Sequence, residues 1–206
     1  MNTKNLYAAS KVEAETLFQQ LATEDPEARV LILWPSTVYG PGNSPSTNIY
    51  RLVDAIYHRR FAMVGPGDAI KSNSHIENLL DATFFLMDRM ERGVQTYIYV
   101  DEPALTTGTL VERIYKLLGK SPPSWRIPLS VASPIATVSD WAADLTGIDF
   151  PITAARIEKF NRSTNFDGSK IREEGFEQPV SNKEALRKTV EWHLQHEYGK
   201  AIPGRL

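Results

Sequence analysis

The sequence of 206 residues contains no cysteine. A disulfide-stabilised scaffold and a metal site built on thiolates are therefore excluded. The lack of cysteine also suits a reducing compartment, so we expect a cytoplasmic protein.

Long hydrophobic runs and an excess of either charge are also missing. No apolar run reaches the roughly 18 residues of a membrane-spanning helix, and no secretion signal opens the chain. The formal net charge is −2 and the pI is about 6.1, so the chain lacks the basic surface typical of nucleic-acid binding. We expect neither a membrane nor a nucleic-acid partner.

A glycine-rich phosphate loop is absent as well. Neither Gly-x-Gly-x-x-Gly nor Gly-x-x-Gly-x-x-Gly occurs, and the pairs Gly40/Gly42 and Gly65/Gly67 fit neither spacing. Such a loop normally brings the backbone close to the pyrophosphate of a dinucleotide. These residues alone are therefore not expected to hold a dinucleotide in the usual way.

What is present starts with residues 5–22, which are rich in Ala, Leu and Glu and predict a helix ended by Asp25-Pro26. Tyr7 and Lys11 would lie one turn apart on one face of it. An ammonium group near a phenol lowers the phenol's pKa from about 10 toward neutrality. Tyr7 is thus a candidate general acid and base with Lys11 beside it. The alternative is a half-buried tyrosine covered by the lysine stem.

The pattern of elements predicts an α/β fold. Residues 29–34 form a continuous apolar run, typical of a strand buried on both faces of a parallel sheet. A loop rich in Pro, Gly and Ser follows at residues 35–47, at the strand end where ligands bind in open α/β sheets. Helices are expected at 48–58, 77–91 and 107–118, and a second buried strand at 95–100.

Weaker patterns fill the rest of the chain. Short strands are expected at 61–64 and 125–127, and an extended piece at 69–76. A helix is expected at 129–145, with Trp141 as a core residue, and another at 153–160. Ser181 and Glu184 form a possible capping box at the start of the last helix.

Two of these segments together resemble a known family. Tyr-Ala-Ala-Ser-Lys-x-x-x-Glu at residues 7–15, followed by a strand and Pro-Ser-Thr-Val-Tyr-Gly-Pro-Gly at 35–42, resembles the extended short-chain dehydrogenases/reductases. Within them the chain is most similar to the NAD-dependent nucleotide-sugar epimerases and dehydratases. In that family the dinucleotide loop precedes the tyrosine. The resemblance therefore concerns the C-terminal portion of such an enzyme.

The resemblance implies the C-terminal part of a Rossmann-like parallel sheet with a smaller, mostly helical substrate-binding portion. Residues 1–40 would be late Rossmann elements, and 41–92 a substrate-binding insertion with a return helix. Residues 93–120 would form the last Rossmann strand and helix, and 121–206 the C-terminal substrate-binding portion.

The resemblance also assigns the catalytic and cofactor residues. Tyr7 matches the tyrosine that exchanges a proton with a sugar hydroxyl, and Lys11 matches the lysine that binds the nicotinamide ribose. Pro35, Ser36 and Val38 stand where the family contacts the nicotinamide. The cofactor implied is NAD or NADP, and no metal is implied.

Some substrate positions follow the first strand. Thr37 falls where many sugar epimerases place an asparagine, a departure that leaves the sugar chemistry open. Asn48 and Ile49 match the helix start that binds the diphosphate of a nucleoside-diphosphate sugar, and free N–H groups there suit an anion. A plain cap or first-turn role for Asn48 is the alternative.

The remaining substrate positions come later. Ala62, Met63 and Val64 match a short strand beside the nucleotide base. Lys71 stands for the arginine that usually pairs with the diphosphate, and it lacks the bidentate fork of arginine. Arg162 could reach a phosphate, although a solvated surface arginine is the alternative.

Two further positions, His75 and Asn78, belong to the same stretch as Lys71. His75 is retained from the family pattern, and we expect a structural, hydrogen-bonding histidine because no second metal ligand lies at a suitable spacing. Asn78 replaces the family's aspartate. Residues 167–176 resemble the closing segment of the family, which packs against the sheet.

The sequence leaves three functions open. The first is an oxidoreductase of the epimerase/dehydratase type, inactive as these residues alone. The second is a hydroxysteroid-type or other small-alcohol dehydrogenase. The third is a non-catalytic binding module. We also expect self-association, as a homodimer or larger assembly, through an exposed sheet edge and the first helix.

Overall fold

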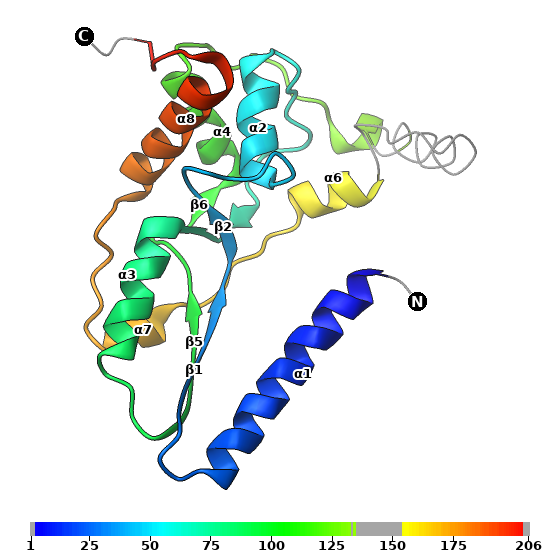
Figure 1. Ribbon diagram of the computed structural model, residues 1–206. Coiled ribbons are helices and arrows are strands. Elements are labelled where there is room, and N and C mark those ends of the chain that lie inside the picture. Colours follow the sequence, from blue (N-terminus) through cyan, green and yellow to red (C-terminus); the bar gives the residue numbers. More distant parts are fainter. Residues whose placement is uncertain (1–2, 133, 135–153, 204–206) are drawn as a thin grey trace.

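A computed structural model describes residues 3–132, 134 and 154–203 of the chain (Figure 1). The helices and strands follow one another in the order α1 (Thr3–Glu24), β1 (Arg29–Pro35), β2 (Thr37–Tyr39), α2 (Asn48–Tyr57), β3 (Ile70–Lys71), β4 (Asn73–His75), α3 (Ile76–Met87), β5 (Gly93–Tyr99), β6 (Leu105–Thr106), α4 (Thr107–Leu117), α6 (Ala154–Asn161), α7 (Ser169–Glu173) and α8 (Asn182–Tyr198). The predicted α/β class is confirmed.

The centre of the lower part in Figure 1 is a parallel pair, β1 and β5, in register from Arg29 opposite Gly93 to Pro35 opposite Tyr99. Successive side chains on a strand point to opposite faces. Val30 and Ile32 are buried, and Trp34 on the same face donates its indole N–H to Glu15 of α1 at 2.7 Å. The helix α1 therefore covers this face. Trp34 itself is 47% exposed, so the strand is less buried at its end than expected.

The other face of the pair packs against α3 and α7. Leu31 and Leu33 join a core cluster whose buried members are Ala82, Leu86, Tyr97, Tyr99, Ile171 and Phe176. Ile171 and Phe176 come from the segment predicted to pack against the sheet, and that prediction is confirmed. Lys170 and Arg172 of α7 donate to the carbonyls of Thr96 and Val100, both at 2.8 Å, which ties α7 to β5.

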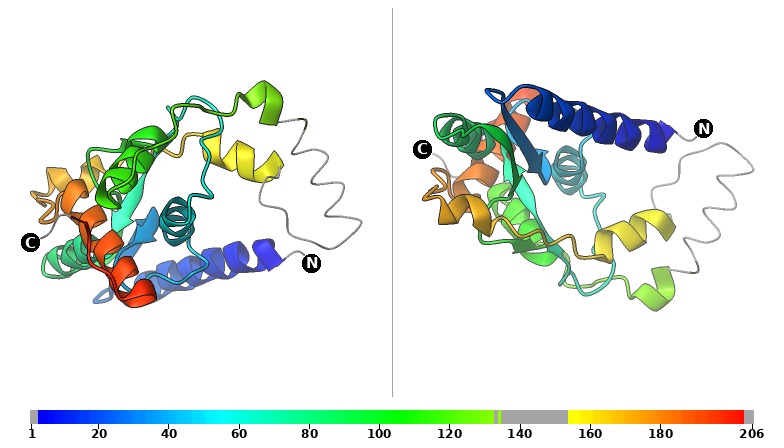
Figure 2. Two further views of the ribbon diagram at one scale, coloured as in Figure 1. Left: turned by 90° about the horizontal axis from the view of Figure 1, so that it is seen from above. Right: turned by 90° about the horizontal axis from the view of Figure 1, so that it is seen from below.

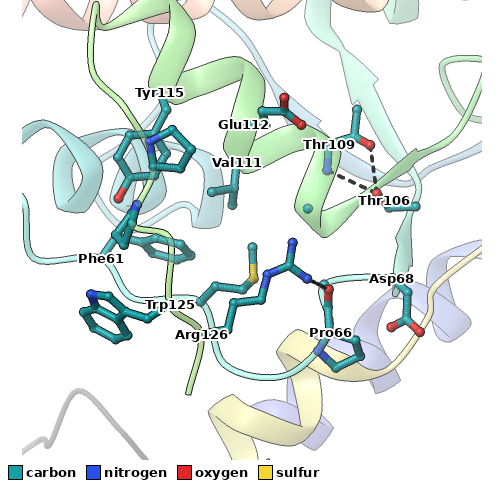
Figure 3. Close-up of a pocket in the computed structure, with 15 residues that line it drawn as sticks. Phe61, Pro66, Asp68, Thr106, Thr109, Val111, Glu112, Tyr115, Trp125 and Arg126 are labelled. Carbon is teal, nitrogen blue, oxygen red and sulfur yellow. Dashed lines mark hydrogen bonds between the residues drawn. The ribbon is translucent and has the colours of Figure 1, made fainter. Parts of the chain in front are cut away.

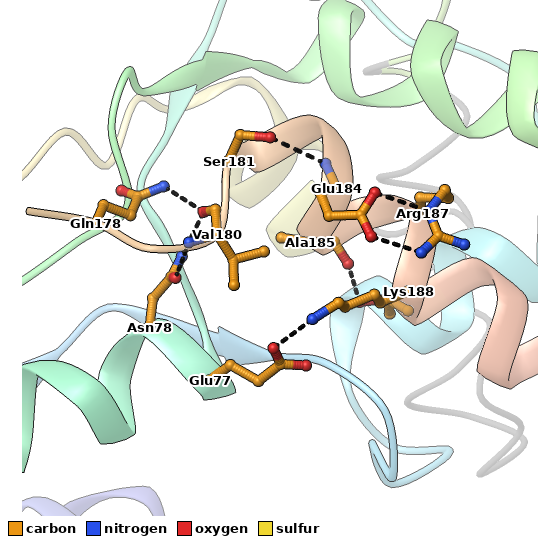
Figure 4. Close-up of polar contacts among 10 residues, drawn as sticks. Glu77, Asn78, Gln178, Val180, Ser181, Glu184, Ala185, Arg187 and Lys188 are labelled. Carbon is orange, nitrogen blue, oxygen red and sulfur yellow. Dashed lines mark hydrogen bonds and ion pairs between the residues drawn. The ribbon is translucent and has the colours of Figure 1, made fainter.

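A helical lobe forms the upper part of Figure 1, where α2, α4 and α8 gather. Its apolar core includes Ile56, Ile114 and Leu186, each no more than 1% exposed. Hydrogen-bonding N-caps hold both α4 and α8, and the one at Ser181 is the cap predicted from the sequence. Thr106 accepts a hydrogen bond from the N–H of Thr109 at 3.1 Å, and Ser181 accepts from Glu184 at 3.3 Å (Figure 4).

Two small sheets connect these parts: β2 pairs in parallel with β4, and β3 pairs antiparallel with β6. The predicted strands at 61–64 and 125–127 are wrong, because only Val64 and Ile127 form a bridge. Pro66 and Pro128 lie close to either side and cannot donate to a longer ladder. The predicted helix at 153–160 is confirmed as α6.

Trp141 and most of the predicted helix at 129–145 lie outside the described residues. Among the residues described, no helix is long and apolar enough to cross a membrane. In Figure 2, seen from above and below, α1 runs along one side of the molecule, and Figure 1 shows that it lies apart from the helical lobe.

Candidate functional site

Tyr7 and Lys11 lie together on the exposed side of α1. The Lys11 Nζ is 5.6 Å from the centroid of the Tyr7 ring, and Tyr7 is 70% exposed. Ser10 donates to the carbonyl of Tyr7 at 2.9 Å, within the same turn. The alternative of a half-buried tyrosine is therefore wrong, and the pair is open to a ligand from solvent.

Two hydrogen bonds hold Ser36, which follows the carboxyl end of β1. Its N–H donates to the carbonyl of Tyr99 at 3.1 Å, and its Oγ lies 2.8 Å from the Oγ of Ser74. Ser74 is fully buried and donates to the same Tyr99 carbonyl at 2.9 Å. Sequence reasoning missed Ser74, because one serine in a short strand carries no signal. These bonds fix the backbone at Pro35 and Ser36.

Thr37 and Val38 follow as part of β2. Thr37 pairs with Asn73 of β4 and is exposed, whereas Val38 pairs with Ser74 and is partly buried. Both predicted positions therefore lie beside Ser36, beyond the carboxyl end of the parallel pair.

Asn48 and Ile49, the first two residues of α2, differ in exposure. Thr47 is the N-cap, and Asn48 is an exposed first-turn residue. Ile49 is 4% exposed and lines a small hollow together with Lys71 and Asn73. The hollow has a volume of about 10 Å³, room for about one water molecule, so it does not enclose a nucleotide.

Lys71 and Arg162 are neighbours although 91 positions separate them. The Lys71 ammonium donates to the backbone carbonyl of Arg162. The segment after Arg162 runs beside β3, with Thr164 N–H on the Ile70 carbonyl and Ser72 N–H on the Thr164 carbonyl, both at 2.9 Å. The Arg162 side chain extends into solvent, 4.0 Å from Glu158. The structure thus brings two predicted basic positions together.

The segment 62–64 belongs to another surface. Met63 is buried, and its side chain lines a hollow between α4 and residues 122–126 (Figure 3). Lys71, Arg162 and Asn48 do not line that hollow. The predicted base-binding residues and the predicted diphosphate residues therefore share none of the three described hollows.

A buried carboxylate, Asp101, links several elements and was missed from the sequence. It accepts hydrogen bonds from the N–H of His75 at 2.8 Å, Asn78 at 3.0 Å and the Tyr99 hydroxyl at 3.0 Å. Burial raises the pKa of Asp101, and these donors oppose the shift. An acidic residue directly after a buried strand was the signal that could have found it.

The asparagine at position 78, where the family pattern has an aspartate, has a physical explanation. Its amide donates to Asp101 at 3.0 Å. The same amide donates to the Val180 carbonyl at 2.9 Å, and the Asn78 oxygen accepts from the Val180 N–H at 2.9 Å (Figure 4). An aspartate here could not donate and would repel Asp101. Asn78 therefore joins α3 to the segment before α8.

His75 is structural, but not through hydrogen bonds of its ring. The residue is fully buried, its ring packs edge-on against Tyr39 at 5.3 Å, and neither ring nitrogen bonds to a described residue. Burial lowers the pKa of His75, while the charges of Glu77 and Asp101 oppose the shift. Within the described part of the chain, no group of three His, Asp or Glu residues is placed to hold a metal ion.

Comparison with known proteins gives the family and the fold that this chain resembles. Residues 1–100 match the sequence model of the NAD dependent epimerase/dehydratase family. Over 193 residues the chain is 28% identical to an N-acetyl-alpha-D-glucosaminyl-diphospho-ditrans,octacis-undecaprenol 4-epimerase of Escherichia coli O157:H7, covering 93% of this chain and 58% of the relative. A 3beta-hydroxysteroid-dehydrogenase/decarboxylase of Arabidopsis thaliana is 23% identical over 198 residues, 90% of this chain and 45% of that protein. The chain spans about half the length of the curated relatives it matches.

Solved structures share the fold. UDP-glucuronic acid 4-epimerase from Bacillus cereus, in complex with NAD, matches with a TM-score of 0.66 and 17% identity over 95% of this chain and 53% of that one. UDP-glucose 4-epimerase from Thermotoga maritima, with UDP-glucose, matches with a TM-score of 0.64 and 16% identity over 93% and 54%. The chain has the Rossmann-type α/β fold of these enzymes, and its first 100 residues match the NAD dependent epimerase/dehydratase family.

Proposed function

We propose that this chain supplies the acid–base and substrate-binding part of an NAD(P)-dependent oxidoreductase that acts on a nucleoside-diphosphate sugar. The observation that carries the proposal is the solvent-open pair of Tyr7 and Lys11 on the helix that leads into β1. Ser36, at the carboxyl end of that strand, is held by Ser74 and Tyr99. Ligands of open α/β sheets bind at this end of the strands.

The residues present fit a nicotinamide cofactor. An exposed hydroxyl and an exposed ammonium face the same solvent space, and the Ser36 backbone is fixed. Lys11 would bind the nicotinamide ribose, and Pro35, Ser36 and Val38 would contact the ring. When bound, the nicotinamide accepts the hydride that leaves the sugar carbon.

The proton is handled by Tyr7. Its phenolate oxygen takes the proton of the sugar hydroxyl as that carbon is oxidised to a ketone, and returns it when the ketone is reduced. The Lys11 ammonium lies beside this ring, 5.6 Å from its centroid. The difference between epimerase, dehydratase and reductase then depends on the later fate of the ketone.

The substrate assignment rests on the other basic positions. Lys71 and Arg162 would pair with the diphosphate, next to the free N–H groups at Asn48 and Ile49. Thr37 would lie against the sugar, and Ala62, Met63 and Val64 beside the base. The absence of cysteine and of a membrane-spanning helix among the described residues suits work in the cytoplasm.

A thermal-shift titration with UDP-glucose tests the substrate assignment. We expect millimolar UDP-glucose to raise the melting temperature of the purified chain, since a ligand at a hundred times its Kd adds about 2.7 kcal/mol. K71M should abolish the shift, and K116M, a matched exposed lysine on α4, should retain it. No shift with the wild-type chain would overturn the assignment.

A hydroxysteroid or another small alcohol is the second candidate substrate. It is supported by the match to the Arabidopsis enzyme and by Thr37 and Lys71, which depart from the sugar-epimerase pattern. Protection by a 3β-hydroxysteroid instead of UDP-glucose would favour it. Protection by neither would favour the third candidate, a non-catalytic binding module.

We further propose that the 206 residues alone do not turn over a substrate, because the sequence has no dinucleotide loop. NAD-dependent epimerisation or dehydrogenation by the purified chain would refute this. Extra turnover after addition of a loop-bearing Rossmann half would support it.

Self-association, as a homodimer or larger assembly, is the last part of the proposal. The exposed large apolar side chains on α1 are Leu6, Val12, Leu17, Phe18 and Leu21. Apolar side chains gathered on one helix favour contact with a second copy. Sedimentation at high concentration should show a species heavier than the 23.2 kDa chain, and L17E/F18E should reduce it. A clean monomer would contradict it.

A further inference from the structure

Helix α1 is held by few packing contacts of its own. From position 6 onward it has no buried residue, and only Ala14, Glu15 and Ala22 are partly buried. None of its side chains belongs to a core cluster of the described residues. An alanine side chain provides little apolar area, so packing alone does not fix the angle at which this helix lies against the sheet.

The C-terminal end of α1 is fixed by the turn that leads into β1 (Figure 1). Glu27 in this turn pairs with Arg92 at 2.7 Å, and the Ala28 carbonyl accepts from the Gly93 N–H at 2.8 Å. Tyr7 lies near the other end of the helix, roughly 25 Å away at about 1.5 Å per residue. A rotation of about 10° at the turn would therefore move Tyr7 by roughly 4 Å.

One side-chain hydrogen bond joins the middle of α1 to β1. The Trp34 indole N–H donates to the Glu15 carboxylate at 2.7 Å. The hydroxyls of Ser10, Thr16 and Thr23 donate to carbonyls within α1 instead. Among the residues that the structure describes, no other side chain of α1 forms a hydrogen bond or an ion pair with another helix or strand. The bond between Trp34 and Glu15 is therefore the contact that opposes rotation of the helix.

Both partners of this bond lie next to the proposed site. Tyr7, Lys11 and Glu15 recur every four residues, so they form one stripe along α1. Trp34 is opposite Ile98 in the parallel ladder, directly before the strand end proposed to contact the cofactor. The bond therefore connects the stripe that carries the proposed acid–base pair with that end of β1.

The same bond determines the partner of the Glu15 carboxylate. Glu15 is one helical turn from Lys11, a spacing at which a carboxylate and an ammonium can pair. Both residues are described by the structure, and no ion pair joins them, because the carboxylate accepts from Trp34 instead. The Lys11 ammonium lies near the Tyr7 ring.

We propose that Trp34 and Glu15 are positioning residues for the pair of Tyr7 and Lys11. Their hydrogen bond sets the angle of α1 against β1 and keeps the Glu15 carboxylate away from Lys11. This role rests on the proposed function, because the position of the pair matters for catalysis only if Tyr7 and Lys11 act on a ligand.

Pulsed electron paramagnetic resonance on the whole chain tests the positioning directly. Since the sequence has no cysteine, A9C and D81C place one spin label on α1 and one on α3, and dilution with unlabelled chain removes distances between copies. We expect a narrow distance distribution, and an about twofold broader one after W34F or E15A, because the long helix then rotates about its turn. E15Q keeps an oxygen acceptor for the indole and should retain the narrow distribution.

The matched control is E13A, which removes an exposed glutamate from the same helix and should leave the distribution unchanged. Distributions in W34F and E15A as narrow as that of the parent protein overturn the proposal. A distribution in E15Q as broad as that in E15A also overturns it, because the hydrogen bond would then not set the angle. E15A leaves β1 intact, so it decides the question even if W34F does not fold.

Turnover of UDP-glucose after addition of a loop-bearing Rossmann half tests the consequence for catalysis. W34F and E15A should lower kcat by about ten- to a hundredfold through misplacement of the acid–base pair, with KM nearly unchanged, and E15Q should retain most of kcat. Unchanged kcat in W34F and E15A overturns the proposal. No turnover by the parent chain in the same mixture overturns the proposed function instead, and the distance distributions then still decide whether this bond positions α1.

Discussion

The helix α1 and the helical lobe differ sharply in how they are packed. On α1, Leu17 and Phe18 are 59% and 53% exposed, whereas Ile56 and Ile114 in the lobe are fully buried. The helix with the predicted catalytic pair thus contributes no side chain to either core cluster of the described residues. Stability and the predicted chemistry belong to different parts of the molecule and can be altered separately.

The largest expected effect comes from the lobe core. I114A should lower the free energy of unfolding by about 2–5 kcal/mol, because it leaves a cavity among fully buried side chains. The matched change on α1, L17A, should cost within about 0.5 kcal/mol. Urea unfolding followed by circular dichroism measures both. An equal loss in the two variants would break the comparison and would mean that α1 is covered by another copy in solution.

The next effect concerns Asn78, whose hydrogen bonds join α3 to the segment before α8 of the helical lobe. N78D should cost about 1–3 kcal/mol, because the Asp101 carboxylate and the Val180 carbonyl both lose a donor. D81N, an exposed change on the same helix, serves as the control and should be nearly neutral. A neutral N78D would show that the bridge in Figure 4 does not contribute to stability.

A smaller effect should appear with pH, and it should come from the buried histidines. Burial lowers the pKa of His193 and of His75 below the ordinary value of about 6.5, so the folded state binds fewer protons than the unfolded state. Stability should therefore fall as the pH drops below about 6.5. H193F, which keeps a ring against Tyr50 and Tyr198, should show a shallower fall in melting temperature between pH 7.5 and 5.5. The same slope in both proteins would contradict this assignment.

The smallest stability effect should come from the proposed catalytic pair, Tyr7 and Lys11. K11M and Y7F change exposed positions on α1 and should each alter the free energy of unfolding by less than about 0.5 kcal/mol. Thermal unfolding checks this. When the chain is combined with a cofactor-binding half, the same variants should lose most of the turnover. A large loss of stability in K11M would show that α1 contributes to the stability of the fold as well as presenting the proposed site.

Local signals explain which parts of the fold could be predicted. The strand at 29–34 and the helices beginning at 48 and 107 have strong apolar patterns, and Thr106 and Ser181 mark helix starts through short-range caps. The strands predicted at 61–64 and 125–127 are absent, and only one bridge forms between Val64 and Ile127. A strand needs a ladder of hydrogen bonds to a partner, and the nearby prolines interrupt that ladder. Sequence patterns do not report that interruption.

In the candidate site, too, the contacts that could be predicted are the local ones. Tyr7 and Lys11 are one helical turn apart, so their proximity could be predicted from spacing. Lys71 and Arg162 meet only because the segment after α6 runs beside β3, and that contact has no local signature. The hydrogen bonds of Asp101 likewise depend on tertiary contacts, and so does the hollow between α4 and residues 122–126 that Trp125 lines (Figure 3).

The ties from α7 to β5 give the parallel pair two unlike borders. The carbonyls of Thr96 in β5 and of Val100, directly after it, already accept from Lys170 and Arg172, whereas in the described part of the chain β1 pairs only with β5. A ribbon of this kind can grow on one side only. One more strand, from whichever chain supplies it, could pair with the free edge of β1. The basic side chains of α7 discourage the pairing of another strand with β5.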